Sequence, residues 1–196
     1  MVDRQLRRRG IEDECVLRAM AEVPRERFLA PELRGDAYRD GAVAIAEGQT
    51  MSQPWIVACM TSLLGLQGHE RVLEVGTGSG YGAAVLSRCC AEVVTIERHA
   101  ALAEHARGVL AGLGYTNVEV RTGDGTLGAP DRAPFGGALV TAVAEGAPPS
   151  AIADQLDPDA ALVCPVRDAL GEHLIRFRGG EQERVVAVRF VPLVSD

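Results

Sequence analysis

The fold is decided by the stretch Arg71-Val72-Leu73-Glu74-Val75-Gly76-Thr77-Gly78-Ser79-Gly80-Tyr81, in which a short apolar run meets three alternating glycines. Residues without a Cβ let the backbone turn sharply and let a ligand lie against it. The pattern therefore predicts a strand at residues 71–75, a glycine-rich loop, and a helix from Ser79 to Cys90.

Apolar runs and amphipathic segments alternate after this loop. Strands are predicted at residues 71–75, 92–96, 117–121, 138–141 and 161–166, and helices at 79–90, 100–113 and 149–156. This order predicts parallel strands with helices on both faces. Gly179-Gly180 separates the last two runs, 173–178 and 184–193, and indicates an antiparallel hairpin. The predicted fold class is α/β, a doubly wound, mostly parallel seven-stranded sheet with an antiparallel C-terminal hairpin and N-terminal helices.

The segment before the sheet predicts two helices and an extended cover. Apolar residues recur at helical spacing from Ile11 to Val23, and Ser52-Gln53-Pro54 opens a second helix that ends at Gly65. Residues 25–48 are irregular and rich in glycine, proline and charge. We expect one domain over residues 1–196, with a helical and lip region at 1–68 and a Rossmann-like core at 69–196.

The composition limits the classes of partner that we expect the protein to bind. A formal net charge of −7 argues against a nucleic acid or an anionic membrane, because either would need a concentrated basic face. The basic cluster Arg4 to Arg9 is interpreted as an exposed helix face. No segment has the roughly 20 apolar residues of a membrane span. We expect a soluble, cytoplasmic monomer.

The cysteines and histidines do not indicate a metal site. The five cysteines are odd in number and lack CxxC spacing, so we interpret them as small core residues in a reducing compartment. The four histidines are scattered without the spacing of metal ligands, and no metal is expected.

The loop spacing and the carboxylate that precedes it favour S-adenosylmethionine (SAM) as the cofactor, and a second carboxylate is placed to bind an adenosine ribose. Glu97 closes the second strand 21 positions after Gly76, where it can accept both hydroxyls of an adenosine ribose. The alternative interpretation of Glu97 is a solvated charge at the end of a strand. The loop spacing is GxGxG, not the GxGxxG of dinucleotide sites, and Glu74 precedes it. A carboxylate suits the ammonium of SAM and would repel a pyrophosphate, so an NAD-dependent oxidoreductase is disfavoured.

A further carboxylate follows the third strand. Gly123-Asp124-Gly125 lies at the same end of the predicted sheet, where Asp124 can meet the adenine amino group. The alternative for Asp124 is an Asx-type turn.

The run Glu47-Gly48-Gln49-Thr50-Met51-Ser52-Gln53-Pro54-Trp55-Ile56-Val57-Ala58 resembles the GQTISQPxIVA segment of the protein-L-isoaspartate O-methyltransferases. Further matches follow in the family's order at residues 9–11, 23–25, 71–81, 95–98, 117–118, 123–125 and 189–193. The resemblance therefore spans essentially the whole chain.

The resemblance implies a Rossmann-like SAM-dependent methyltransferase that esterifies the α-carboxylate of isoaspartyl residues in damaged proteins. The ester then closes to a succinimide, which starts repair. The resemblance also implies that Ser52 is the active-site hydroxyl. The local pattern alone favours Ser52 as a helix N-cap, and the two roles can coexist.

The expected site has two parts. Its cofactor residues are Thr50, Glu74, Gly76, Thr77, Gly78, Ser79, Gly80, Tyr81, Glu97, Arg98, Gly123, Asp124 and Gly125. Its substrate residues are Ile45, Met51, Ser52 and Val191, which would read the peptide through the lip and the C-terminal strand end. A carboxylate has a reference pKa of about 4 and is ionised at neutral pH, so no general base is expected.

Seven positions depart from the family pattern, and they keep the first of two alternatives open. They are Ala44, Ala46, Gly136, Glu145, Asp159, Ala160 and Arg167. One alternative is a relative that methylates a dedicated aspartate of a partner peptide. The other is a SAM-binding module without catalysis, against which the presence of Ser52 and Glu97 weighs.

Overall fold

The glycine-rich stretch passes from a strand to a helix in the computed structural model, which describes residues 1–195. Strand β3 (Arg71–Val75) is almost wholly buried, and helix α3 (Tyr81–Leu86) follows the loop. This helix is shorter than the predicted 79–90. It ends early because the next backbone amides, those of Arg88 and Cys89, donate to carbonyls three residues back (3.1 Å and 2.8 Å), which is the spacing of turns.

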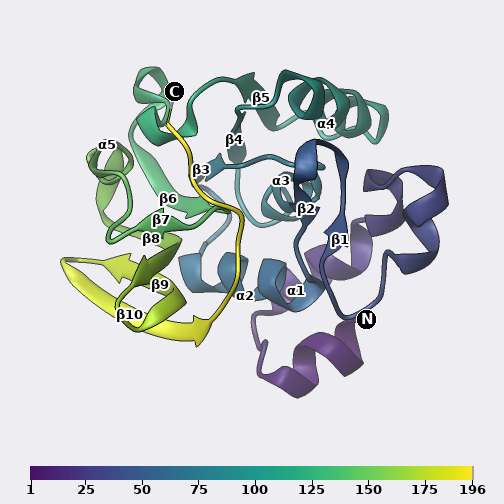
Figure 1. Cartoon of the computed structure of the whole chain (residues 1–196), viewed down its shortest axis with the longest axis horizontal. Coiled ribbons are helices and arrows are strands. Elements are labelled where there is room, and N and C mark those ends of the chain that lie inside the picture. Colours follow the sequence, from purple (N-terminus) through teal and green to yellow (C-terminus); the bar gives the residue numbers. More distant parts are fainter. Residues whose placement is uncertain (196) are drawn as a thin grey trace.

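The predicted mostly parallel sheet is confirmed, but within residues 1–195 it has eight strands: seven run in the order β10-β9-β8-β6-β3-β4-β5 (Figure 1), and one lies off this path. The parallel strands around β3 are β4 (Glu92–Glu97), β5 (Val118–Thr122), β6 (Phe135–Val140) and β8 (Leu156–Asp168). A two-residue strand that sequence reasoning did not predict, β7 (Ala144–Glu145), pairs with β8.

The register of the three central strands positions the site. Val75 of β3 pairs with Ile96 of β4 and with Val140 of β6, all in parallel. The three strands therefore end at the same level. The residues that follow this level in the three strands gather at one edge of the sheet.

The predicted C-terminal hairpin is confirmed in its turn but not in its second strand. Strands β9 (Gly171–Arg178) and β10 (Glu181–Ala187) are antiparallel and are joined by Gly179 and Gly180, both with positive φ. The expected strand at 184–193 is wrong in its latter half. Val191 and Leu193 bond instead to the backbone of Val143, which draws the chain across the ends of the parallel strands (Figure 1).

The N-terminal region forms the predicted helices, with shifted bounds, and a small lip. Helix α1 (Glu14–Glu22) is capped by Asp13, and α2 (Pro54–Leu64) ends at Gly65 in the left-handed conformation. Strands β1 (Val43–Ala44) and β2 (Thr50–Met51) pair and form the lip. The remaining segments are short turns of helix: Val2–Leu6, Arg7–Arg9, Arg25–Phe28, Pro31–Asp36 and Ala46–Gly48.

Helices cover the two faces of the sheet unequally. One hydrophobic cluster joins β3 through Val72 to the N-terminal helices, α2, α3 and α4 (Ala100–Gly112). The other joins β3 through Leu73 and Val75 to the short α5 (Ser150–Ala153). Four of the five cysteines are buried and all five are free thiols. The prediction that cysteines serve as core residues is thus confirmed for Cys59, Cys89, Cys90 and Cys164, whereas Cys15 is half-buried.

Candidate functional site

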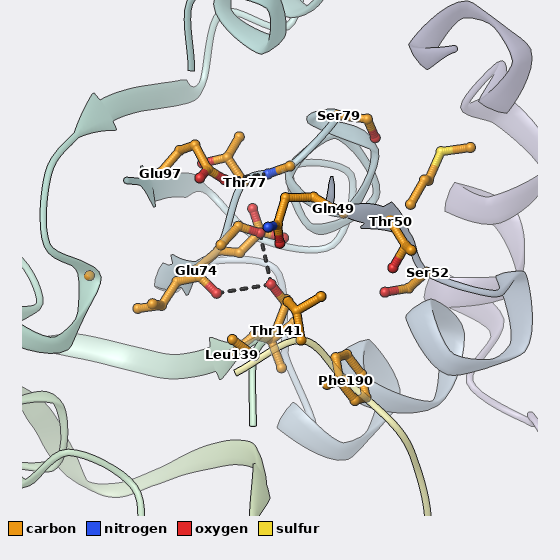
Figure 2. Close-up of a pocket in the computed structure, with 18 of the residues that line it drawn as sticks. Gln49, Thr50, Ser52, Glu74, Thr77, Ser79, Glu97, Leu139, Thr141 and Phe190 are labelled. Carbon is orange, nitrogen blue, oxygen red and sulfur yellow. Dashed lines mark hydrogen bonds between the residues drawn. The ribbon is translucent and has the colours of Figure 1, made fainter. Parts of the chain in front are cut away.

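The glycine loop is held closely against the end of β6. Gly76, Gly78 and Gly80 all have positive φ (+95°, +54° and +88°), which favours glycine. The Thr141 hydroxyl lies within hydrogen-bond distance of two carbonyls, those of Val75 (3.0 Å) and Gly76 (2.8 Å), between which its single hydrogen is shared (Figure 2). A Cβ on Gly76 would lie 2.2 Å from Thr141 Oγ1. Only glycine at residue 76 therefore permits this close approach.

Glu97 is not the solvated strand-end charge that its local pattern allowed. It is 5% exposed, and its two carboxylate oxygens accept from the backbone amides of Gly78 (2.9 Å) and His99 (3.0 Å). A carboxylate offers about four acceptor positions. Two therefore stay available to a ligand in the adjacent cavity.

Glu74 is a buried carboxyl beneath the first turn of α3. Its side chain is accommodated because residue 82 is glycine: a Cβ there would lie 2.4 Å from Glu74 Oε1. Thr95 Oγ1 donates to Glu74 Oε2 (2.6 Å). The pKa of Glu74 is raised to about 8, chiefly by burial; the hydrogen bond from Thr95 opposes this rise, and the nearby Glu97 adds to it. Glu74 is therefore largely protonated at neutral pH.

A cavity of about 310 Å³ opens at this edge of the sheet. Ten of the predicted cofactor residues line it: Thr50, Glu74, Gly76, Thr77, Gly78, Ser79, Tyr81, Glu97, Arg98 and Gly125. Its size suits a small-molecule ligand.

Three predicted cofactor residues do not line the cavity. A Cβ on Gly80 would lie 3.2 Å from Ala106, so this glycine lets the loop approach α4. Asp124 accepts hydrogen bonds from the backbone amide (2.8 Å) and the hydroxyl (2.7 Å) of Thr126, so the Asx-type turn that the sequence allowed does form. Gly123 also lies outside the lining. Contact between Asp124 and adenine stays a prediction.

Sequence reasoning missed several lining residues, among them Gln49, His99, Thr141 and Phe190. Gln49 lies within the motif at 47–58, and His99 and Phe190 are near neighbours of predicted residues, so proximity to a motif was the available signal. Thr141 had no such signal, because it reaches the site through the register of the sheet.

Ser52 is not the cap of α2. The helix begins at Pro54, Gln53 occupies the cap position, and no side chain caps it. Within residues 1–195 the Ser52 hydroxyl forms no hydrogen bond, while the Ser52 carbonyl accepts from the Arg25 guanidinium (2.7 Å). Figure 2 shows the hydroxyls of Thr50 and Ser52 turned toward the cavity. The capping interpretation is therefore wrong.

A groove of about 390 Å³ adjoins the cavity. The lip, the start of α2 and the C-terminal segment line it through Ala42, Thr50, Ser52, Gln53, Ile56, Ala187, Val188, Arg189 and Phe190. Thr50, Ser52 and Phe190 line both hollows, which therefore meet at these side chains. Of the predicted substrate residues, Met51 and Val191 line the cavity, whereas Ile45 lines neither hollow.

The seven departures from the family pattern lie outside both linings. Glu145 and Arg167 compensate each other by forming an ion pair, and Arg167 also pairs with Glu172 (2.7 Å). A Cβ on Gly136 would lie 2.8 Å from the Cβ of Glu70, so a larger residue would clash there. None of the seven side chains lines the walls of the site, although Ala44 pairs with Thr50, which lines both hollows.

The structure also bears on the N-terminal basic cluster, on metal ligands and on membrane-spanning helices. The N-terminal basic cluster is exposed, as predicted, and Arg7 and Arg9 pair with Glu14 (2.6 Å) and Asp40 (3.3 Å). In residues 1–195 no group of three or more histidines, cysteines or acidic residues is arranged to hold a metal ion. The helices of the same range include none that is long and apolar enough to cross a bilayer.

Comparison with known sequences gives one family. The model of the protein-L-isoaspartate(D-aspartate) O-methyltransferase family matches residues 1–196. A protein-L-isoaspartate O-methyltransferase of Bradyrhizobium sp. strain BTAi1 is 51% identical over 194 residues, which cover 96% of this chain and 90% of that relative. One of Pelotomaculum thermopropionicum is 49% identical over 203 residues, covering 100% and 87%.

Solved structures share the fold. A protein-L-isoaspartate O-methyltransferase aligns with a TM-score of 0.84 at 28% identity, over 95% of this chain and 62% of that chain. A Plasmodium falciparum protein, described as a beta-aspartate methyltransferase in complex with S-adenosyl-L-homocysteine, aligns with a TM-score of 0.81 over 97% and 95%. At 23% identity the second likeness bears on the fold alone.

Proposed function

We propose a division of roles within the site of this chain, which belongs to the protein-L-isoaspartate(D-aspartate) O-methyltransferase family. The chain transfers a methyl group from SAM to the carboxyl of L-isoaspartyl residues, which starts repair through a succinimide. What the family leaves to be assigned is which side chains of this chain hold the cofactor and which hold the acceptor.

The cavity residues fit SAM. Glu97 has acceptor positions to spare for the two ribose hydroxyls, and Gly78 presents bare backbone against which a ligand can lie. Glu74 lines the same cavity and offers a negative charge to the SAM ammonium once it is ionised. When bound there, SAM supplies a methyl group on a positively charged sulfur.

The acceptor role of Ser52 rests on one observation, that the cavity and the groove meet at the hydroxyls of Thr50 and Ser52. A peptide in the groove would place one carboxylate at this junction. Both hydroxyls can donate to that anion, and hydrogen bonds to ionised groups are the strong ones. Because the acceptor is already ionised, the site has to align it and does not have to remove a proton.

A serine pair tests this role. Ser52→Ala should lower the rate of methyl transfer to an isoaspartyl peptide at least tenfold, with SAM affinity and melting temperature near those of the parent. Ser62→Ala is the matched control, because Ser62 lies on α2 with a buried, unpartnered hydroxyl outside both linings. Equal rates of methyl transfer in Ser52→Ala and Ser62→Ala would show that the Ser52 hydroxyl takes no part in the reaction.

The dedicated-peptide alternative receives little support from the lining of the site. It rested on the seven departures, and these lie outside the walls of both hollows. The non-catalytic alternative is disfavoured because Ser52 stands at the junction and Glu97 faces the cofactor cavity.

We also propose that the chain is one domain and acts as a cytoplasmic monomer. The hydrophobic cluster that contains Leu6 and Leu17 also contains Val72 and Val163 of the sheet, which supports a single folding unit. The free cysteines suit a reducing compartment. Large exposed apolar side chains in the described chain lie in four separate segments, at Tyr38, Leu127, Leu170 and Val194. Light scattering on the protein as it elutes from a size-exclusion column should give the mass of one chain.

A further inference from the structure

Arg25 is a buried cation without a carboxylate partner. Its side chain is 0% exposed, and no ion pair joins it to an acidic residue within 1–195. Nε donates to the Ala37 carbonyl (2.7 Å) and one terminal nitrogen to the Ser52 carbonyl (2.7 Å), whereas the other terminal nitrogen has no partner. Burying a charge in this way is costly unless another group compensates for it.

The guanidinium connects the acceptor side of the site to the cofactor side. It lies over the ring of Tyr81 at 4.6 Å from the centroid, and Phe28 packs against the same ring at 5.7 Å. Tyr81 is the first residue of α3 after the glycine loop and lines the cofactor cavity. Ala37 belongs to the segment that leads into the lip. Arg25 thus fixes three elements relative to one another.

The contact with Ser52 falls on the residue that we place beside the acceptor. A hydrogen bond to the Ser52 carbonyl fixes the backbone that carries its hydroxyl. It also puts the guanidinium charge behind Ser52, outside the lining of both hollows, where low polarity strengthens the attraction to an anion. A lysine cannot reproduce these contacts, because its three N–H donors share one nitrogen, whereas arginine donates from two separate nitrogens while its plane stacks on the ring.

We propose that Arg25 is a positioning residue for methyl transfer, which fixes Ser52 relative to Tyr81 and supplies the positive charge behind the carboxylate-binding hydroxyls. The inference rests on the proposed role of Ser52. The isoaspartyl carboxylate compensates the guanidinium when the substrate binds. The position that Arg25 imposes on Ser52 then affects the rate of methyl transfer, and the charge of Arg25 affects peptide binding.

Two substitutions separate geometry from charge. Arg25→Lys keeps the charge and loses the fork, so kcat should fall about 10- to 100-fold with KM for the isoaspartyl peptide near that of the parent. Arg25→Met loses both, so kcat should fall as far and KM should rise about tenfold or more. SAM affinity should stay within about threefold in both variants. Thermal unfolding of each variant defines a temperature at which that variant is folded and can be assayed.

Arg71→Lys is the matched control. Arg71 donates to Glu92 (2.6 Å) and to the Arg132 carbonyl (2.8 Å), outside both linings, so its loss should reduce stability without changing kcat or KM. If folded Arg25 variants keep the kinetic constants of the parent, or if weaker SAM binding accounts for their whole loss, Arg25 is not a positioning residue. If Arg25→Met does not fold, the kcat and KM of Arg25→Lys decide. Failure of the parent to methylate the peptide would instead refute the proposed function.

Discussion

Binding of SAM is predicted to release a proton from Glu74. In the free protein, burial raises the pKa of this carboxyl to about 8, so roughly nine-tenths of the molecules carry the proton at pH 7. The ammonium of SAM favours the ionised carboxylate in the complex. Binding at pH 7 should therefore release about 0.9 proton per SAM.

The same linkage gives SAM affinity a pH dependence of known sign. Only the ionised form offers the charge, and its population rises about 25-fold between pH 6.5 and pH 8.5 for a pKa of about 8. The dissociation constant should fall by up to that factor as the pH rises. It should level off above the pKa of Glu74.

Isothermal titration calorimetry measures both quantities. At pH 7 the binding enthalpy should differ between phosphate and Tris buffers, because their heats of ionisation differ. Glu74→Gln should abolish the difference and flatten the pH profile. His99→Gln, a change at another side chain that lines the cavity, should preserve both effects. Equal enthalpies in the two buffers for the parent protein would show that Glu74 does not ionise on binding.

Two further predictions concern the cofactor side of the site. Glu97→Ala should raise the SAM dissociation constant at least tenfold, since hydrogen bonds to a charged group contribute about 1.5 to 3 kcal/mol; Glu104→Ala, an exposed change on α4, should leave equilibrium dialysis values unaltered. Gly82→Ala should displace the Glu74 carboxyl, weaken SAM binding and abolish proton release, because the new Cβ would lie 2.4 Å from Oε1. Gly108→Ala on α4 meets nothing within 4 Å and should instead stabilise the protein by up to about 1 kcal/mol in urea unfolding. A Gly82→Ala protein that binds SAM like the parent would contradict this geometry.

Features set by neighbours along the chain were predictable from the sequence. The glycine loop after β3 and the Gly179-Gly180 turn follow from backbone conformations that glycine adopts with ease. Glu97 could be placed at the cavity because it closes a strand parallel to β3. For the two glycine turns the local pattern was sufficient, whereas Glu97 could be placed only together with the glycine loop that follows the neighbouring strand.

Features set by distant partners were not predictable. Thr141 reaches Val75, 66 positions earlier, through the pairing of β6 with β3. Ser52 has the local pattern of a cap, but its carbonyl is held by Arg25, 27 positions away, and the helix starts beyond it. The expected last strand leaves the sheet because Val143 pairs with the backbone of Val191 and Leu193.

Discrimination between isomeric peptides tests the account most directly. An isoaspartyl residue carries its free carboxylate on the α-carbon, whereas the ordinary isomer would place it about one methylene away from the junction at Ser52. Misplacement by about 1 Å can cost on the order of 100-fold in rate. Methyl-ester formation should therefore be at least about 100-fold faster on isoaspartyl peptides than on their aspartyl twins, across several unrelated flanking sequences. Methylation confined to one flanking sequence, or a preference for ordinary aspartate, would contradict the account.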